Sequence, residues 1–338
     1  MSAVLATVAR TDNAPVDLRR RFLVISPVRD EAAFLKRTID SVVAQTVRPT
    51  LWLIVDDGST DETPAIAARA AATHAWIRLH RRPRRGERRV GGGVVEAFHE
   101  GLALCDADAF EYVCKLDGDL ELPPGYFARV LAQMEREPRL GNFSGKVWLR
   151  RPDGRLVPER MGDENAIGAA KFYRVACFRD IGGFVPGGCW DGIDGHRCRM
   201  TGWMARSVDD PELRIVHLRP MGSSVGGLWR GRQRWGRGKW FMGSAWYYVL
   251  AVALYRMAER PYVLGGLGIL TGYVRALLSG APRYADPAFR RFLRRYERAA
   301  LLRGKRRVTQ LYDEQLRTRH PPPLPAGLVS HCHRGPSR

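Results

Sequence analysis

Short runs of apolar residues recur at intervals over the first 120 residues of the chain. Four of them predict buried β-strands: FLVIS (22–26), LWLIV (51–55), WIRLH (76–80) and FEYVCKL (110–116). The apolar residues are nearly continuous rather than alternating, which is typical of strands that are covered on both faces.

Between and after these runs, apolar residues recur at helical spacing. Three segments predict amphipathic helices, with these apolar faces: Leu35, Ile39, Val42 and Val43; Val94, Phe98 and Leu102; Phe127, Val130, Leu131 and Met134. The alternation of strands and helices predicts an α/β fold, with a Rossmann-like, mainly parallel sheet and helices on both faces.

Two local signals predict where helices begin. Ser59 and Glu62 have the spacing of a capping box, which places a helix start near Asp61. Pro123 and Pro124 suit the first turn of the helix that follows them.

Polar motifs stand at the ends of the four predicted strands. They are SPVRDE (26–31), DDGSTD (56–61), HRRPRRGERRVGGG (80–93) and DGDLE (117–121). Because α/β sheets bind ligands just beyond the carboxyl ends of their parallel strands, these motifs are expected to share one site.

The composition of the motifs indicates what that site binds. Asp117 and Asp119 form an Asp-x-Asp pair, which can ligate a hard divalent cation and leave positions for substrate phosphates, although such a pair alone is usually a solvated turn. The glycines around Gly92 can open a helix whose amides face phosphate, and Arg88 and its neighbours add positive charge. A carboxylate of DDGSTD can accept hydrogen bonds from a nucleoside. Cation, nucleoside and diphosphate together describe one ligand, a nucleotide-sugar.

The bulk composition sets wider bounds. The chain has 338 residues and a net charge of +20, which favours phosphate-bearing or anionic-membrane partners, or else reflects arginine-rich coding. Its six cysteines form no CxxC pair, so reduced thiols are expected, and HCH at 331–333 is interpreted as incidental. The N-terminus shows no signal-peptide pattern, which predicts a cytoplasmic protein.

Three motifs in order resemble the family 2 glycosyltransferases. These are SPVRDEAAFLKRTIDSVVAQT, LIVDDGSTDET and YVCKLDGDLELPPGYF, and the resemblance covers about residues 20–240. It implies a GT-A fold and inverting transfer from a nucleotide-diphospho-sugar. It also implies that Asp30 or Glu31 and Asp57 contact the nucleoside, that Asp117 lies near ribose and metal, and that Asp119 binds Mn²⁺ or Mg²⁺.

Together the motifs and the resemblance define a set of expected donor-binding residues: Pro27, Arg29, Asp30, Glu31, Asp57, Ser59, Arg88, Gly92, Asp117, Arg234 and Trp235. The last two belong to LWRGRQRWGRGKW, which is similar in part to the Gln-x-x-Arg-Trp signature of processive family 2 synthases. Gly231 stands where the glutamine is expected, and the alternative for this segment is a solvated basic loop.

The catalytic base is expected in WDGID (190–194). The family usually carries Glu-Asp or Asp-Asp here, so the resemblance implies Asp191 as the first choice and Asp194 as the second. The alternative for Asp191 is that it caps a helix. An inverting transfer needs one carboxylate to take the proton of the acceptor hydroxyl.

The C-terminal third contains the most apolar stretches, 240–257 and 261–280. Neither is a clean run of ~20 apolar residues, so they are interpreted as helices in the membrane interface or as helices packed on the catalytic domain. We expect a flexible N-terminus over 1–20 and a catalytic domain over 21–240, divided into a nucleotide-sugar half (21–122) and an acceptor half (123–240). A helical, membrane-associated region over 241–312 and a disordered tail over 313–338 follow.

These observations leave several functions open. The first is a metal-dependent glycosyltransferase, peripheral on the inner face of the cytoplasmic membrane, that acts on a glycan or lipid-linked acceptor in surface polysaccharide or glycoconjugate synthesis. The others are a polyprenyl-phosphate glycosyltransferase, a non-catalytic nucleotide-sugar sensor and a nucleic-acid-binding protein. Acidic triplets at strand ends would repel a phosphate backbone, so no nucleic-acid partner is expected.

Overall fold

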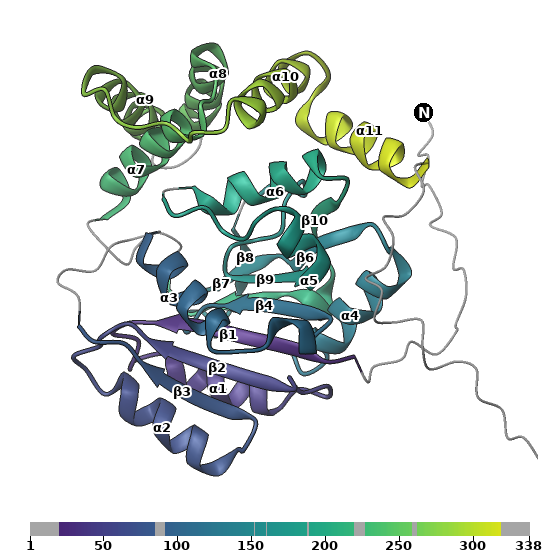
Figure 1. Ribbon diagram of the computed structural model, residues 1–338. Helices are drawn as coiled ribbons and strands as arrows, with labels where there is room; N and C mark the ends of the chain where they lie inside the picture. The colour runs from purple at the N-terminus through teal and green to yellow at the C-terminus, as the bar shows by residue number, and fades with distance from the viewer. Residues whose placement is uncertain are drawn as a thin grey trace, which may run out of the picture.

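The fold is built on a seven-stranded, twisted sheet, shown in a computed structural model that describes residues 20–84, 92–151, 153–159, 161–187, 189–219, 227–258 and 262–318 (Figure 1). The strand order is β10-β6-β9-β4-β1-β2-β3. Only β9 runs antiparallel to its neighbours, β4 and β6. The bounds are β1 Phe22–Val28, β2 Leu51–Asp56, β3 Ile77–Arg81, β4 Tyr112–Leu116, β6 Leu140–Gly145, β9 Ala170–Arg174 and β10 Met204–Val208.

Helices cover both faces of this sheet, as the continuous apolar runs predict. In β1, Phe22 and Val24 join one hydrophobic core, whereas Leu23 and Ile25 join the core on the opposite face. The helices of the α/β part are α1 Leu35–Val43, α2 Thr63–Thr73, α3 Gly92–Ala103, α4 Tyr126–Arg136, α5 Val175–Asp180 and α6 Trp190–Met200.

A second, smaller sheet has the order β5-β11-β7-β8. Its strands are β5 Leu120–Glu121, β7 Val147–Arg150, β8 Leu156–Pro158 and β11 Ile215–His217. Strand β5 begins directly after Asp119, and its antiparallel register pairs Leu120 with His217. This pairing brings a histidine from far along the sequence to the Asp-x-Asp pair.

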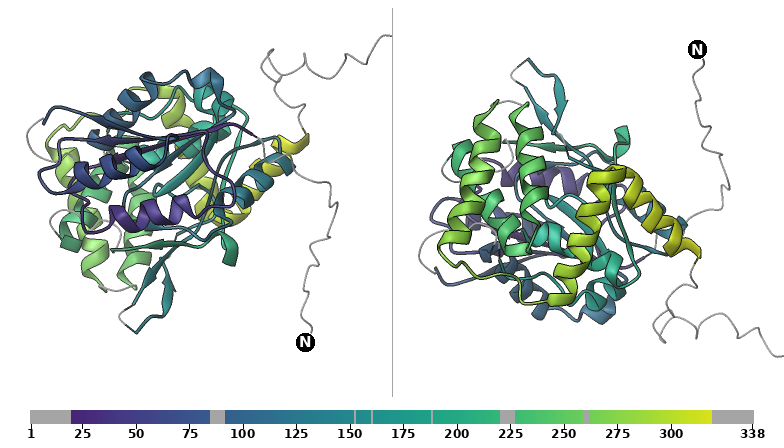
Figure 2. Two further views of the ribbon diagram at one scale, coloured as in Figure 1. Left: turned by 90° about the horizontal axis from the view of Figure 1, so that it is seen from below. Right: turned by 90° about the horizontal axis from the view of Figure 1, so that it is seen from above.

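Five helices complete the described chain: α7 Gly227–Met242, α8 Trp246–Met257, α9 Leu264–Leu278, α10 Pro287–Arg303 and α11 Lys305–Thr318. They lie in one layer over α6, on the side away from α1 and α2 (Figures 1 and 2). Helices α7 and α9 approach closely because a Cβ at Gly236 would lie 1.9 Å from the carbonyl oxygen of Ile269. Among the described residues, no helix combines the length and the apolar character needed to cross a bilayer.

The structure confirms the four predicted strands and corrects several details of the helices. Helix α2 begins at Thr63 without a capping box, because the Ser59 hydroxyl instead accepts a hydrogen bond from the amide of Asp30. In α3 the buried face is centred on Val95 and Phe98, while Val94 and Leu102 are only partly buried.

Two predicted boundaries also change. The prolines before α4 precede it rather than forming its first turn, since Gly125 is the N-cap. Helix α11 continues to Thr318, so residues 313–318 are helical and not part of a disordered tail, and the rest of the predicted tail lies outside the described residues. The predictions for residues 1–19 and for HCH at 331–333 lie outside the described residues.

Candidate active site

Asp119, directly before β5, is the centre of a buried polar cluster. Its Oδ2 lies 3.2 Å from Nε2 of His217 and 2.6 Å from Nε of Arg219. Arg219 also donates to Oε1 of Glu31, at 2.5 Å. The guanidinium therefore joins the loop after β1 to the Asp-x-Asp pair, two of the motifs that the sequence predicts to share a site.

His217 is, together with Arg219, a residue of this cluster that sequence reasoning missed. Burial alone would lower its pKa, but its contacts with Asp119 and Glu159 outweigh burial and raise the pKa to about 9. For Asp119 burial acts to raise the pKa, and His217 and Arg219 hold it below its ordinary value. No local pattern in ELRIVHLR marks His217, because only the pairing of β11 with β5 places it there.

Asp117 lies near a second group of residues, which includes Lys115, Gly168 and Asp191. Lys115 contacts Oδ1 of Asp117 and donates to the carbonyl oxygen of Gly168 at 2.8 Å. Gly168 lies against Asp191, since a Cβ on it would be 3.5 Å from Oδ2 of that carboxylate. Lys115 and Gly168 thus lie between Asp117 and Asp191.

The two candidate bases on α6 have different surroundings. Asp194 is buried, and Nζ of Lys171 lies 2.9 and 2.7 Å from its two carboxylate oxygens, with the Tyr173 hydroxyl also bonded. Burial raises the pKa of Asp194, against the opposing charge of Lys171. Asp191 is only partly buried in the first turn of α6, whose N-cap is Cys189, and no side-chain cap is formed. The capping alternative for Asp191 is therefore not observed.

The predicted nucleoside side joins the loops after β1 and β2. Asp30 has a positive φ of 53°, and its Oδ1 accepts a hydrogen bond from the amide of Thr60 at 2.8 Å. Its own amide donates to the Ser59 hydroxyl at 2.9 Å. Asp57 is ion-paired with Arg82, which lies in the predicted arginine-rich loop. The described parts of the four polar motifs therefore meet at the carboxyl ends of neighbouring strands, as expected.

The remaining expected donor-binding residues are spread more widely. Pro27 is buried in β1, opposite Val55 of β2, and Arg29 is buried next to Asp30. Gly92 begins α3, as predicted, and Arg88 lies outside the described residues.

Arg234 and Trp235 belong to the helical layer rather than to the strand ends. Both lie in α7, and the Trp235 ring packs against the guanidinium carbons of Arg232 and Arg256 at 5.3 and 4.9 Å. The segment is a helix, so the alternative of a solvated basic loop is not what the structure shows.

A divalent cation fits this site only in part. In the described part of the chain, no group of three or more histidine, cysteine or acidic side chains is arranged to hold a metal ion. Asp119 and His217 would offer one oxygen and one nitrogen 3.2 Å apart, with Asp117 two residues away in the chain, and His217 would have to lose the proton that its raised pKa retains. Such a set suits a cation that takes its other ligands from a bound phosphate and from water.

The sequence of the α/β part decides the family. Residues 23–185 match the family model described as Glycosyl transferase family 2. This stretch is a family 2 glycosyltransferase domain. The match includes the loops of Asp30, Asp57 and Asp119, and it ends just before α6.

Comparison with solved structures shows the fold. Residues 1–349 of TarS from S. aureus, in complex with UDP-GlcNAc, are similar with a TM-score of 0.52 and 15% identity, covering 87% of this chain and 92% of that one. The mannosyltransferase PcManGT from Pyrobaculum calidifontis, in complex with GDP-Man and Mn²⁺, gives a TM-score of 0.49 and 19% identity over 87% and 84%. No curated protein sequence matches the chain. At 15% identity, the likeness to TarS shows the GT-A fold alone.

Proposed function

We propose that this chain is a metal-dependent hexosyltransferase that moves a sugar from a nucleotide-diphospho-sugar to an acceptor hydroxyl with inversion. The observation that carries the proposal is the series of neighbours Asp117, Lys115, Gly168 and Asp191, which begins two residues before Asp119. It supports a reaction site between a cation at Asp119 and the partly exposed carboxylate of Asp191. The family 2 domain supplies the reaction class.

Donor binding is assigned to the strand ends. Asp30, Glu31 and Asp57 would accept hydrogen bonds from the nucleoside, with Ser59 fixing the Asp30 loop. The first amides of α3 at Gly92 suit a diphosphate, because backbone N–H groups at a helix N-terminus are unpaired and carry partial positive charge. Arg88 precedes that helix in the sequence and would add its charge.

We also propose that Arg234 and Trp235 contact the nucleotide-sugar. Their place on α7 means that either one would reach the sugar or diphosphate only from the side of the helical layer.

The cation is assigned to Asp119 and His217, with Asp117 beside them. When bound, it supplies positive charge that offsets the charge growing on the departing diphosphate. Arg219 would have to give up its contact with Oδ2 of Asp119 for that oxygen to become a ligand. Mn²⁺ and Mg²⁺ both suit carboxylate and phosphate oxygens, and a histidine ligand favours Mn²⁺ over Mg²⁺.

Asp191 is assigned as the catalytic base. Asp194 is buried, and its two oxygens already accept hydrogen bonds from Lys171, from the Tyr173 hydroxyl and from the Gly195 amide, so its acceptor positions are occupied. Asp191 is partly exposed and lies next to Gly168 at the rim of the site. It would take the proton of the hydroxyl as that oxygen attacks the anomeric carbon in line with the leaving diphosphate.

Features of the helical layer support a proposal for the acceptor and the location. Exposed apolar side chains form one stripe on α8, Trp246, Leu250 and Leu254, and another on α9, Leu264, Leu267, Val274 and Leu278. Arginines on the adjacent α10 and the net charge of +20 complement an anionic bilayer. We therefore place the protein in the cytoplasm, peripheral on the inner face of the membrane. There it would glycosylate a glycan or lipid-linked acceptor in surface polysaccharide or glycoconjugate synthesis.

A screen of nucleotide-sugars by thermal unfolding, with and without Mn²⁺, tests the donor. One or more nucleotide-sugars should raise the midpoint only when Mn²⁺ is present, and Asp119→Ala should remove that dependence. Transfer from the selected donor to model acceptors, followed by NMR of the anomeric centre, then tests inversion. The proposal fails if no nucleotide-sugar stabilises the folded protein in either condition.

A further inference from the structure

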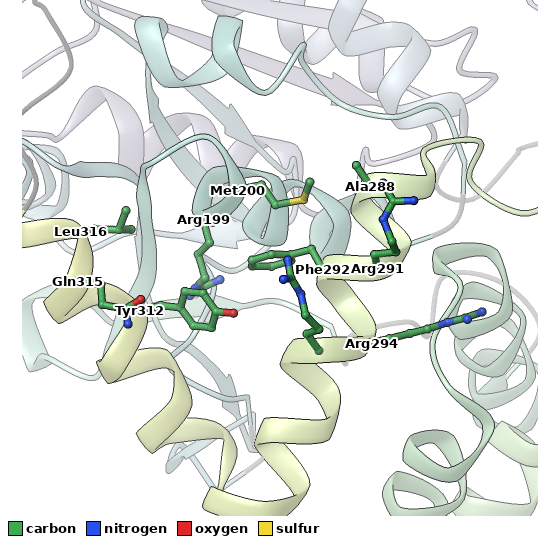
Figure 3. A pocket seen from close by; sticks show the side chains of 10 residues that line it. Arg199, Met200, Ala288, Arg291, Phe292, Arg294, Tyr312, Gln315 and Leu316 are labelled. Carbon is green, nitrogen blue, oxygen red and sulfur yellow. The ribbon is translucent and has the colours of Figure 1, made fainter.

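A cavity of about 650 Å³ lies in the helical layer, away from the candidate active site. It is bounded by the last turn of α6, by α10 and by α11 (Figure 3). Arg199 and Met200 line it from the C-terminal end of α6, whereas Asp191 stands in the first turn of that helix. At 1.5 Å per residue, these two ends of α6 are roughly 12 Å apart. The cavity is thus separate from the predicted donor and acceptor positions.

The lining combines strong positive charge with an apolar wall. Four arginines face the cavity and no acidic side chain lines it: Arg199, Arg291, Arg294 and Arg295. Phe292 and Tyr312 stand on its walls with their ring centroids 5.5 Å apart. Figure 3 shows them coming from different helices, with the Tyr312 hydroxyl turned toward the space.

The arginines that line the cavity differ in whether they already form hydrogen bonds or ion pairs within the protein. Arg199 is buried and donates to the backbone carbonyls of Gly195 and Ala205, so it is part of the floor. Arg291 and Arg295 are exposed, and among the described residues no carboxylate lies within ion-pair distance of either. These two guanidinium groups can therefore bind an anion without breaking an existing ion pair.

A second cavity of about 250 Å³ extends the positive surface along α10. It shares Arg291 and Arg294 with the first cavity and adds Arg283 and Arg290. Its fifth lining residue is Pro287, so it too has no acidic side chain. The two cavities form one arginine-lined track, which matches an anion with several oxygen acceptors, because each guanidinium offers a planar fork of donors.

We propose that the α10–α11 cavity binds a phosphate-bearing anion whose apolar part rests on Phe292 and Met200. The neighbouring helices favour an anionic phospholipid as its source. Leu301 and Leu302, at the end of α10, are 44% and 80% exposed, and the apolar stripes of α8 and α9 belong to the same layer. A lipid held there would have its headgroup on the arginines and its chains along an apolar surface. The proposal does not depend on glycosyl transfer.

The test compares two double variants of the full-length protein that remove the same charge from the same helix. R291A/R295A removes the two unengaged arginines of the cavity, and R298A/R303A removes two exposed arginines of α10 that line neither cavity. The first measurement is the stabilisation of the protein by inorganic phosphate against chloride of equal ionic strength. Wild type and R298A/R303A should be stabilised by phosphate, and R291A/R295A should lose the effect.

The second measurement identifies the source of the anion. Binding to vesicles of phosphatidylcholine with phosphatidic acid should fall about tenfold more for R291A/R295A than for R298A/R303A if the ligand is a lipid headgroup. An equal loss of vesicle binding in both variants, with phosphate stabilisation still lost only in R291A/R295A, identifies a soluble phosphate compound. R291K/R295K keeps the charge and should still bind phosphate less tightly than wild type, since the ammonium offers no planar fork. Undiminished phosphate stabilisation in R291A/R295A would overturn the site.

Discussion

The α/β part and the helical layer differ in which side chains they bury and which they expose. In the α/β part several buried charged side chains form ion pairs, such as Lys171 with Asp194 and His217 with Asp119. In the helical layer, large apolar side chains remain outside, with Trp246 at 68% and Leu278 at 80% exposure. Arginines of α10 lie on the surface beside them.

This difference follows from what each part must stabilise. A buried charge without a partner is strongly destabilising, so the α/β part can place a carboxylate inside only where a cationic side chain meets it. An exposed apolar stripe gains nothing from water, and the stripes along α8 and α9 are therefore the basis of the membrane contact proposed above.

The largest expected effect is on Asp119. Asp119→Ala should lower kcat/KM by about 10³-fold, because it removes the carboxylate assigned to the cation and leaves His217 and Arg219 without it. Circular dichroism should show a folded protein. Glu121→Ala is the matched control, since Glu121 is a carboxylate two residues away whose ion pairs with Arg37 and Arg150 are exposed. Equal activity in the two variants would remove Asp119 from the mechanism.

Asp194 should matter for stability. Asp194→Asn leaves the fully buried Lys171 without its counter-charge, so the free energy of unfolding should fall by about 3–5 kcal/mol. Denaturant unfolding measures this change. Adding Lys171→Met should recover much of the loss, because the charge that lacks a partner is then gone. A fully stable single variant would show that the Lys171–Asp194 pair contributes little.

Asp191 should matter for turnover and not for stability. Asp191→Asn keeps the size of the side chain and removes its basicity, so kcat should fall by about 10²-fold while the Kd of the donor stays near that of wild type. Steady-state kinetics and donor titration separate the two quantities. Normal turnover in Asp191→Asn, together with an inactive but folded Asp194→Asn, would exchange the two roles.

The smallest expected effect contrasts two leucines of equal exposure. Leu254 on α8 and Leu104 after α3 are both 57% exposed, but only Leu254 belongs to the apolar stripe. Leu254→Ser should weaken binding to anionic vesicles by about tenfold, and Leu104→Ser should leave it unchanged. Flotation at low and high salt measures both, and salt should weaken the arginine contribution. Equal effects of the two substitutions would contradict a specific membrane-facing stripe.

The sequence alone predicted four strands of the main sheet, β1 to β4, and the motifs at their ends, but not β6, β9 and β10. A parallel strand covered on both faces needs a continuous apolar run, and the loops that follow such strands must meet at one edge. Glu31, Asp57 and Asp119 could therefore be assigned to one site before any geometry was known. Their order along the chain was also enough to identify the family resemblance.

The contacts that define the site were decided by tertiary structure. His217 and Arg219 reach Asp119 because β11 pairs with β5, and nothing in the sequence around either residue predicts that register. The choice between Asp191 and Asp194 also depends on Lys171, a strand residue about 20 positions earlier that faces α6. Local spacing along the sequence predicts which face of a helix or strand a side chain occupies. The partners of that side chain depend on how distant segments pack against each other. This packing determines the burial of the side chain, its protonation and therefore its chemistry.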